Sequence, residues 1–365
     1  MSQMAAARSI ASEVGVSLAQ RQHQPELDAL RFFAFLSVFI FHAGRSFLAK
    51  DAHVPLYAPL SFGLPVFFLL SSYLITGLLL KELDATGTVR VKAFYARRAL
   101  RIWPLYLSFL AGCYVLGLIV HGLHMETSRL LAFVFLSGNW YVGAFGWGHS
   151  PIYPLWSISV EEQFYLIWPA VVMLGRRFLM PAALAIVPLS LGCVALQCAY
   201  GSSADAIWTN SCSQFLYFAS GTLAAIYFAR KPIKKGVSRG LLSIAFGLGT
   251  WWVIDSLCPI KAQGSAPHAL PFVAGYGALA VSCVAILFGF LSLPRYVFPK
   301  WLIYLGKISY GLYVFHKLCQ FAVPHLGLRG PVLNLAASLV ATVACAALSY
   351  RFLEKPCLKL KERFA

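Results

Sequence analysis

Acidic residues are scarce in this sequence, and so is charge of either sign. Asp and Glu together number 13 among 365 residues, and charged residues make up only 12%, against roughly a quarter in soluble domains. Hydrophobic residues make up 59%, and the mean hydropathy is +0.71. Because so few charges cannot cover a water-exposed surface of this size, the composition excludes a soluble domain. It predicts an all-α, polytopic membrane protein.

Metal-binding and disulfide patterns are also missing. The nine cysteines include no C-x-x-C pair, and an odd, scattered set is typical of small residues in membrane helices. One disulfide among Cys198, Cys212 and Cys258, near outward helix ends, is left open. His121 and His124 share one face of a helix, but no partner ligands follow at matching spacing. We therefore expect no metal site.

The net charge of +17 comes without any module that reads nucleic acid. Basic residues gathered on one membrane face orient the protein and attract anionic headgroups, so the expected partners are membrane lipids and not nucleic acid. The two halves of the chain also show no clear internal repeat, which is a common sign of a secondary transporter.

Membrane-spanning helices need roughly 20 apolar residues each. A shorter apolar run, Leu130 to Leu136, is too brief to span and predicts an interfacial segment. We count ten stretches of sufficient length, at approximately 29–48, 57–80, 101–121, 155–174, 179–199, 213–229, 239–257, 270–291, 301–322 and 331–353.

The basic residues predict the orientation of these spans. If the N-terminus is inside, 24 of the 30 Lys and Arg residues fall on the cytoplasmic side. Both termini are therefore expected in the cytoplasm. Residues 1–24 are polar without a signal-peptide pattern and predict a flexible leader, residues 25–356 a single transmembrane domain, and residues 357–365 a basic cytoplasmic tail.

The first span carries ionisable residues that a bilayer should reject. His42 follows Arg31 by eleven residues, which places it about 16 Å deeper on nearly the same helix face, and Asp28 lies on that face too. A lone histidine is more often a hydrogen-bonded structural residue. Intramembrane ionisable groups become functional candidates when others converge on them, and here others do.

The third span begins with the sequence AFYARRALRIWP, where Arg97, Arg98 and Arg101 lie within about one helical turn. These arginines either anchor the helix at the cytoplasmic surface or bind phosphate oxygens of a cofactor that arrives from the cytoplasm. Arg98 and Arg101 share a face, and guanidinium forks suit bidentate phosphate binding.

Two further spans carry candidates. Glu161 and Glu162 are adjacent on the fourth span, so at least one must face the protein interior, either in a salt bridge or in a role in binding or in tuning His42. On the ninth span, His316 either lines an acceptor pocket together with Tyr310 and Tyr313 or is a satisfied residue of a helix interface, and the interface is favoured.

These motifs resemble the acyltransferase-3 family of integral membrane acyltransferases, which includes O-acetyltransferases of lipopolysaccharide, exopolysaccharides, Nod factors and macrolides. The resemblance covers nearly the whole chain. Family members usually have Gly where Ala29 and Ser72 stand. The matching segments are DALR followed by FH, FGLPVFFLLSSYLITG, RRALRIWP, LWSISVEEQFYLIWP, ISYGLYVFH and YRFLEKP.

The resemblance implies a fold of ten spanning helices and a set of roles. It implies that His42, with Arg31 at the start of its motif, is catalytic, and that the arginine pair Arg98 and Arg101 holds acyl-CoA. It leaves open whether Glu161 or Glu162 is the motif glutamate. Because many relatives carry a C-terminal SGNH-type esterase domain and this sequence stops at Ala365, we expect the stand-alone form.

The implied activity is transfer of an acyl group, with acetyl expected, from cytoplasmic acyl-CoA to a hydroxyl of an envelope or exported glycan, at the bacterial cytoplasmic (inner) membrane. His42 acts either as general base or as an acyl carrier. The acceptor is a carbohydrate or glycolipid, open among O-antigen, exopolysaccharide, peptidoglycan-linked polymer and small glycosides. The oligomeric state is left open.

A transporter is the alternative from another class. In a glycan exporter or proton-coupled carrier, His42, Glu161 and Glu162 would relay protons. The absence of repeats and the arginines at the cytoplasmic surface favour the enzyme.

Overall fold

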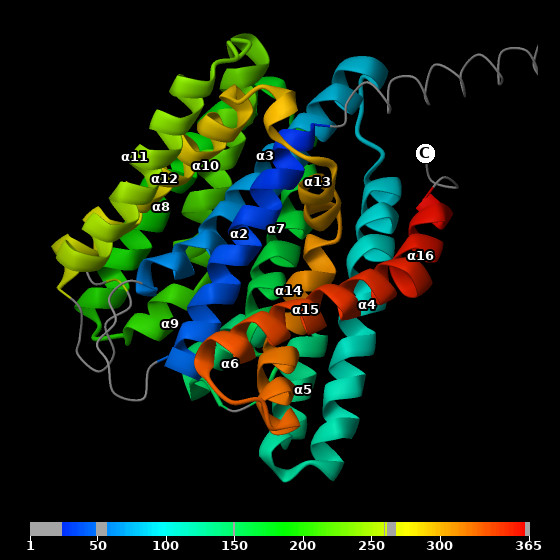
Figure 1. Ribbon diagram of the computed structural model, residues 1–365. Coiled ribbons are helices and arrows are strands. Elements are labelled where there is room, and N and C mark those ends of the chain that lie inside the picture. The colour runs from blue at the N-terminus through cyan, green and yellow to red at the C-terminus, as the bar shows by residue number, and fades with distance from the viewer. Residues whose placement is uncertain (1–23, 49–56, 149, 259, 261–267, 362–365) are drawn as a thin grey trace, which may run out of the picture.

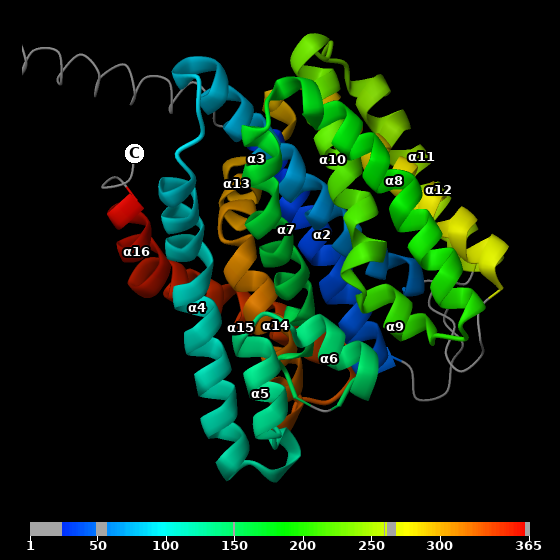
Figure 2. The same ribbon diagram turned by 180° about the vertical axis from the view of Figure 1, so that it is seen from behind.

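The computed structural model describes residues 24–48, 57–148, 150–258, 260 and 268–361. All regular elements in these ranges are helices (Figure 1, Figure 2). The predicted leader, 1–24, lies outside the described residues except for Gln24, and so do residues 362–365 of the predicted tail. The all-α class expected from the composition is confirmed.

The longer helices follow the predicted apolar stretches. They are α2 Pro25–Ala43, α3 Gly63–Thr86, α4 Val91–Ile119, α7 Trp156–Met173, α8 Arg176–Ala199, α10 Ser211–Arg230, α11 Val237–Leu257, α12 Ala269–Ser292, α14 Ser309–Ala322 and α15 Pro331–Ser349. The shorter helices are α5 Thr127–Val134, α6 Gly138–Phe145, α9 Ala204–Thr209, α13 Lys300–Lys307 and α16 Lys355–Lys359, and a π-helical turn η7, Tyr350–Glu354, joins α15 to α16.

Seven helical segments within the described residues are long and apolar enough to cross a membrane, namely those built on α2, α3, α4, α8, α11, α12 and α15. The other three predicted spans coincide with α7, with α10 and with the pair α13 and α14. The sequence predicted one continuous span over 301–322, but the structure has two helices there, α13 and α14. The chain leaves the helical conformation at Ile308, where φ is −93° and ψ is 10°. The number of spans and the cytoplasmic side of the termini remain predictions.

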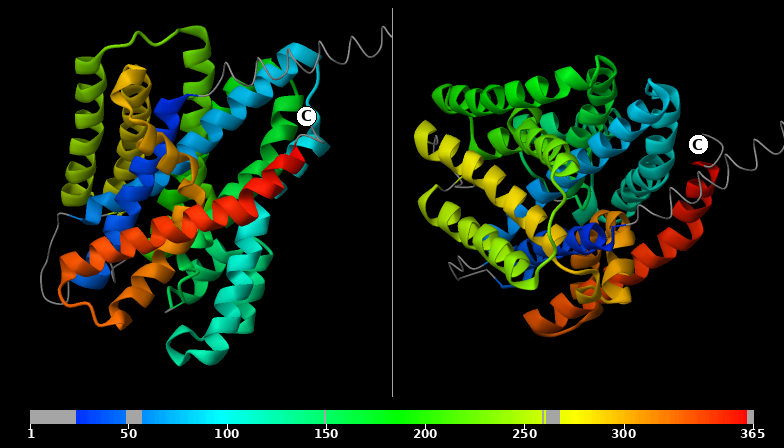
Figure 3. Two further views of the ribbon diagram at one scale, coloured as in Figure 1. Left: turned by 45° about the vertical axis from the view of Figure 1, so that its right-hand side comes forward. Right: turned by 90° about the horizontal axis from the view of Figure 1, so that it is seen from above.

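Helix α2 lies inside the bundle and positions the site (Figure 1). It packs against α3, α12, α13 and α14. Helices α8, α10, α11 and α12 lie on one side of it, whereas α4 and the slanting α15 lie on the other (Figure 3). The described chain begins and ends toward the same end of the bundle, the upper end in Figure 1.

Two glycines allow backbone-level contact between helices. A Cβ on Gly306 of α13 would lie 1.9 Å from the Asp28 carbonyl oxygen of α2, and a Cβ on Gly221 of α10 would lie 2.1 Å from Ser72 Oγ of α3. Ser72 itself is fully buried. The serine that stands where the family usually has glycine is thus accommodated by a glycine on the facing helix.

All nine cysteines lie within the described residues and are free thiols. The disulfide left open among Cys198, Cys212 and Cys258 is therefore not formed in this structure. Instead, Cys212 is a hydrogen-bond neighbour of Cys193 on α8.

Candidate active site

A cavity lies between α2, α3, α4, α7 and α14, with roughly 860 Å³ of space including its opening. Its α3 lining extends from Leu64 to Ile75, so by the helical rise the cavity follows α3 for about 16 Å. Apolar side chains line much of the wall, and the polar groups gather toward the Ile75 end.

Three arginines form the basic end of this cavity. Arg31 of α2, Arg98 of α4 and Arg101 of α4 all line it. Arg31 Nη1 lies 2.5 Å from Asp28 Oδ1, an ion pair one helical turn apart. The Arg98 guanidinium lies 5.8 Å from the ring centroid of Phe94 and 5.7 Å from that of Tyr165. The structure thus brings together two arginine motifs that are separated by about 70 residues in the sequence.

The Arg98 side chain is incompletely paired. Its Nε is buried and has no hydrogen-bond partner among the described residues. Leaving a buried donor of a charged group without a partner costs about 1–3 kcal/mol or more. An unpaired cationic donor beside a cavity is therefore a place where an anionic ligand would bind favourably.

Arg97, the third arginine of the motif, does not line the cavity. Its Nη2 lies 3.3 Å from Glu82 Oε2, and Glu82 also accepts a hydrogen bond from the Arg90 backbone N–H at 3.0 Å. Arg97 therefore lies at the margin of the basic end, held by a carboxylate near the end of α3.

The structure distinguishes the two adjacent glutamates of α7. Glu161 lines the cavity and accepts hydrogen bonds from Ser71 Oγ, at 2.5 Å, and from the Tyr165 hydroxyl. Glu162 points elsewhere: its Oε2 accepts from Trp103 Nε1 at 2.9 Å, and its Oε1 is buried without a partner in the described part of the chain. Because successive residues on a helix point about 100° apart, Glu161 can face the cavity while Glu162 faces Trp103.

Two tyrosines of α14 also line the cavity. The Tyr310 hydroxyl donates to the Ile102 carbonyl oxygen of α4 at 2.7 Å, which joins α14 to α4 beside the arginines. The Tyr313 hydroxyl lies 2.7 Å from the Pro154 carbonyl oxygen and 2.8 Å from Ser157 Oγ, toward the Leu64 end. Tyr310 thus lines the cavity beside its basic end.

His42 does not line the cavity, which corrects the expectation of one continuous polar stripe from Arg31. Its ring lies next to His316 of α14, with ring centroids 5.2 Å apart. His316 in turn lies 5.5 Å from the ring centroid of Tyr313, which does line the cavity. The histidine pair therefore lies next to Tyr313, a residue of the cavity wall, and outside the cavity lining.

His316 is not the fully satisfied interface residue that the sequence favoured. It is completely buried, and its Nδ1 lies 2.6 Å from the Tyr313 carbonyl oxygen. Because a carbonyl oxygen can only accept, Nδ1 carries the hydrogen and Nε2 is left as an acceptor. Nε2 has no hydrogen-bond partner among the residues that the structure describes.

Four polar residues of the cavity were not among the candidates: Ser71, Ser157, Tyr165 and Ser309. Each lies within a segment that carries the family resemblance. Serines and tyrosines are common in membrane helices, so their residue types alone gave no signal. No group of three or more His, Cys, Asp or Glu within the described ranges is placed to hold a metal ion.

A family model described as an acyltransferase domain, acyltransferase-3, matches residues 24–351. The chain belongs to this family. The match includes all five cavity-lining helices and the histidine pair.

Similar proteins carry O-acetyltransferase names. The chain is 28% identical to "Peptidoglycan O-acetyltransferase OatA" of Listeria monocytogenes, with 93% of this chain and 56% of that protein covered. It is also 28% identical to "Putative peptidoglycan O-acetyltransferase YrhL" of Bacillus subtilis, with 91% and 54% covered. The chain thus spans about half the length of these relatives. No solved structure matches it significantly.

Proposed function

We propose that the protein is a membrane O-acetyltransferase that moves an acetyl group from acetyl-CoA to a hydroxyl of a cell-envelope glycan. Family membership and the relatives' names support acyl transfer as the reaction class. The observation that carries the proposal is the buried, incompletely paired Arg98 at the basic end of a cavity in an apolar bundle.

The basic end suits the phosphates of acyl-CoA. Arg31, Arg98 and Arg101 present planar guanidinium groups, which bind phosphate oxygens through paired, charge-assisted hydrogen bonds. Acyl-CoA is made in the cytoplasm, and the basic end lies toward the side predicted to be cytoplasmic. The flexible arm of CoA would then extend along α3 and carry the thioester toward Tyr313.

The histidine pair suits the acyl-transfer step. In the direct scheme, His42 removes the proton of the glycan hydroxyl as its oxygen attacks the thioester carbonyl. The C–S bond then breaks, and CoA leaves as a thiolate that takes up a proton. General-base catalysis of this kind contributes about 10²–10⁴-fold. In the alternative scheme the imidazole is acylated first and the hydroxyl attacks the acyl-histidine.

The path from cavity to His42 passes Tyr313. This residue lines the cavity next to the histidine pair, so its side chain must rotate, or the thioester must pass beside it, for the carbonyl to reach His42. His316 Nδ1–H is fixed on the Tyr313 carbonyl oxygen, so the other nitrogen, Nε2, is the one available to accept a proton from His42 or from the acceptor hydroxyl.

Glu161 is proposed as a positioning residue for the basic end. Its carboxylate is oriented by Ser71 and Tyr165, and its charge acts on Arg98. The negative charge of this carboxylate partly balances the positive charge of the arginines. Because its oxygens accept hydrogen bonds from Ser71 and Tyr165, the arginines keep donors for phosphate oxygens. Glu162, bonded to Trp103, is proposed to stabilise the contact between α7 and α4.

The acceptor class is proposed from the relatives. Because the two relatives named above are described as acting on peptidoglycan, a peptidoglycan fragment is the first acceptor to test, followed by O-antigen and exopolysaccharide fragments. The acceptor would approach His42 from the side opposite the arginines, which fits a protein of the bacterial cytoplasmic membrane whose product faces outward.

Transfer of label from acetyl-CoA is the direct test. Purified protein in neutral lipid nanodiscs is incubated with [¹⁴C]acetyl-CoA and glycan fragments, and label in the glycan is measured. The wild type should transfer label, and the His42→Ala variant should lose transfer while eluting as the same species on size exclusion. A transporter would move glycan across vesicles without transferring label, and that result would refute the proposal.

A further inference from the structure

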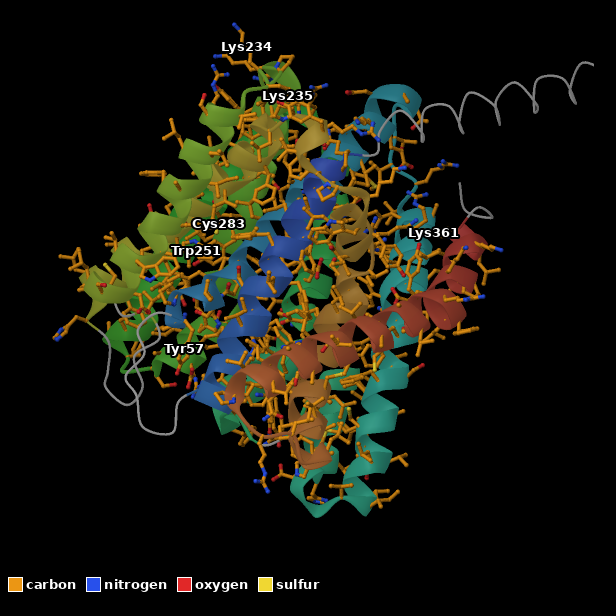
Figure 4. The ribbon with its side chains drawn as sticks, viewed as in Figure 1. Tyr57, Lys234, Lys235, Trp251, Cys283 and Lys361 are labelled. Atoms are coloured by element: carbon orange, nitrogen blue, oxygen red, sulfur yellow. The ribbon has the colours of Figure 1, made fainter. Side chains whose placement is uncertain are left out.

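The C-terminal segment brings a fourth cation to the basic end. Helix α16, Lys355–Lys359, packs against α4, and the described chain continues to Lys361 (Figure 4). Lys361 is half-buried there, unlike the exposed Lys355 and Lys359 on the same segment. From the sequence alone, these lysines are only part of a basic C-terminal segment.

The charges that act most strongly on Lys361 are all positive. Burial, followed by the nearby Arg101, Arg98 and Arg97 in that order, lowers the pKa of Lys361 to about 7. Lys361 is therefore close to all three arginines. In the described part of the chain, Glu82 lies beside Arg97 and Glu354 of η7 faces Arg101. Neither carboxylate appears among the groups that act on Lys361.

Such a cluster is unfavourable without an anion. Like charges gathered at a partly buried position repel, and the fold could have avoided this cost by exposing Lys361 as it exposes Lys359. The buried, unpaired Nε of Arg98 is a second, independent sign that an anion belongs here. Several clustered phosphate groups would satisfy both features.

The position of Lys361 indicates which phosphate group of the donor it would bind. Arg98 and Arg101 line the cavity, whereas Arg97 and Lys361 do not. A donor whose thioester lies inside the cavity places its pyrophosphate beside the lining arginines. The phosphate farthest from the thioester, the ribose 3′-phosphate of CoA, would then lie outside them, toward α16.

We propose that Lys361 binds the ribose 3′-phosphate of the acyl-CoA donor and makes the enzyme discriminate against donors that lack this phosphate. This inference rests on the proposed function, because it assigns one residue to the donor site of that reaction. It also gives the segment after α15 a role in donor binding.

The test compares acetyl-CoA with acetyl-dephospho-CoA, which lacks only the 3′-phosphate. In the wild type, KM should be about tenfold higher for acetyl-dephospho-CoA, as expected for loss of one charge-assisted contact. In Lys361→Ala, KM for acetyl-CoA should rise about tenfold, KM for the dephospho donor should change little, and kcat should be retained for both. Lys361→Arg should restore the discrimination.

Lys359→Ala is the matched control, because Lys359 is exposed on the same segment and should leave both KM values unchanged. An unchanged KM ratio in a Lys361→Ala protein that elutes like the wild type would overturn the inference and leave the proposed function standing. Failure of the wild type to transfer label from acetyl-CoA would overturn both.

An anionic lipid headgroup offers the same phosphate chemistry from another source. The measurements are therefore made in nanodiscs of phosphatidylcholine alone and again with 30% phosphatidylglycerol. A Lys361→Ala effect that is equal in both supports the donor contact. An effect that appears only with phosphatidylglycerol would assign Lys361 to the lipid surface and refute the inference.

Discussion

His316 Nδ1 lies 2.6 Å from the carbonyl oxygen of Tyr313, and this contact fixes which nitrogen of the buried imidazole carries hydrogen. The other nitrogen, on a ring 5.2 Å from that of His42, is then an acceptor without a partner among the described residues. Two histidines from helices far apart in sequence thus lie ring to ring next to Tyr313.

Substitution of His316 should lower turnover without removing donor binding. His316→Phe keeps the aromatic packing but removes the acceptor, so kcat should fall about 10–100-fold while KM for acetyl-CoA changes less than threefold. The kcat and KM of label transfer are the measurements. Equal kcat in wild type and His316→Phe would show that the ring is only structural.

Arg98 should be sensitive to shape as well as charge. Arg98→Ala should raise KM for acetyl-CoA about tenfold or more, and Arg98→Lys should recover only part of this loss, because lysine has no planar fork. Arg176→Ala, which removes an exposed ion pair with Asp84, serves as control and should be neutral. Full recovery by Arg98→Lys would contradict bidentate phosphate binding.

Substitutions of the two glutamates should differ in their effect on activity. Glu161→Gln removes the negative charge beside Arg98 and should lower kcat/KM about 10–100-fold. Glu162→Gln keeps an oxygen that can accept from Trp103 and should cost less than about threefold. The measurement is kcat/KM of label transfer for both variants at one pH. A larger loss in Glu162→Gln than in Glu161→Gln would assign the motif role to Glu162.

Donor affinity should depend on pH through Lys361. Because its pKa is lowered to about 7, Lys361 is charged below that pH and loses its proton as the pH rises above it. The other charged groups near Lys361 are Arg97, Arg98 and Arg101 of α4, and Glu354 of η7 faces Arg101. KM for acetyl-CoA should therefore rise several-fold between pH 6 and pH 8. The rise should be smaller in Lys361→Ala, which shares all other titrating groups.

Helix packing should fail at Gly221 and not at Gly77. A Cβ on Gly221 would lie 2.1 Å from the Leu69 carbonyl oxygen, so Gly221→Ala forces α10 away from α3 and should destabilise the protein by about 1–3 kcal/mol. Gly77 on α3 has open space around it, and Gly77→Ala should be neutral or stabilising by up to about 1 kcal/mol. Thermal unfolding in detergent compares the two variants.

The class of fold and the membership of the site were accessible from sequence because both depend on residue type. Apolar runs located the helices, and ionisable residues inside those runs indicated Arg31, Arg98 and the pair Glu161 and Glu162 without choosing between the two glutamates. The break at Ile308 was not expected, although Gly306 and Lys307 come directly before it, because neither residue type by itself ends a helix. The break depends on tertiary packing, in which Gly306 lies directly against the backbone of Asp28.

Contacts between helices were also out of reach. Helical spacing placed His42 and Arg31 on one face, but it could not show that His42 lies outside the cavity lining, next to His316. The choice between Glu161 and Glu162 depends on the rotation of α7 relative to α3, which Ser71 reveals only in three dimensions. The position of Lys361 near the arginines could not be predicted either, because it depends on the path of the chain after α15.

Helix α2 carries Arg31 near one end and His42 near the other, and a straight α-helix holds them about 16 Å apart. Helix α14 runs beside it with Tyr310 and His316 in the same order. Under the proposed function, this spacing would set the length that the donor's arm must have. A thioester analogue with one β-alanine unit removed or added would present its carbonyl too short of, or too far past, the imidazole, however well its nucleotide is held.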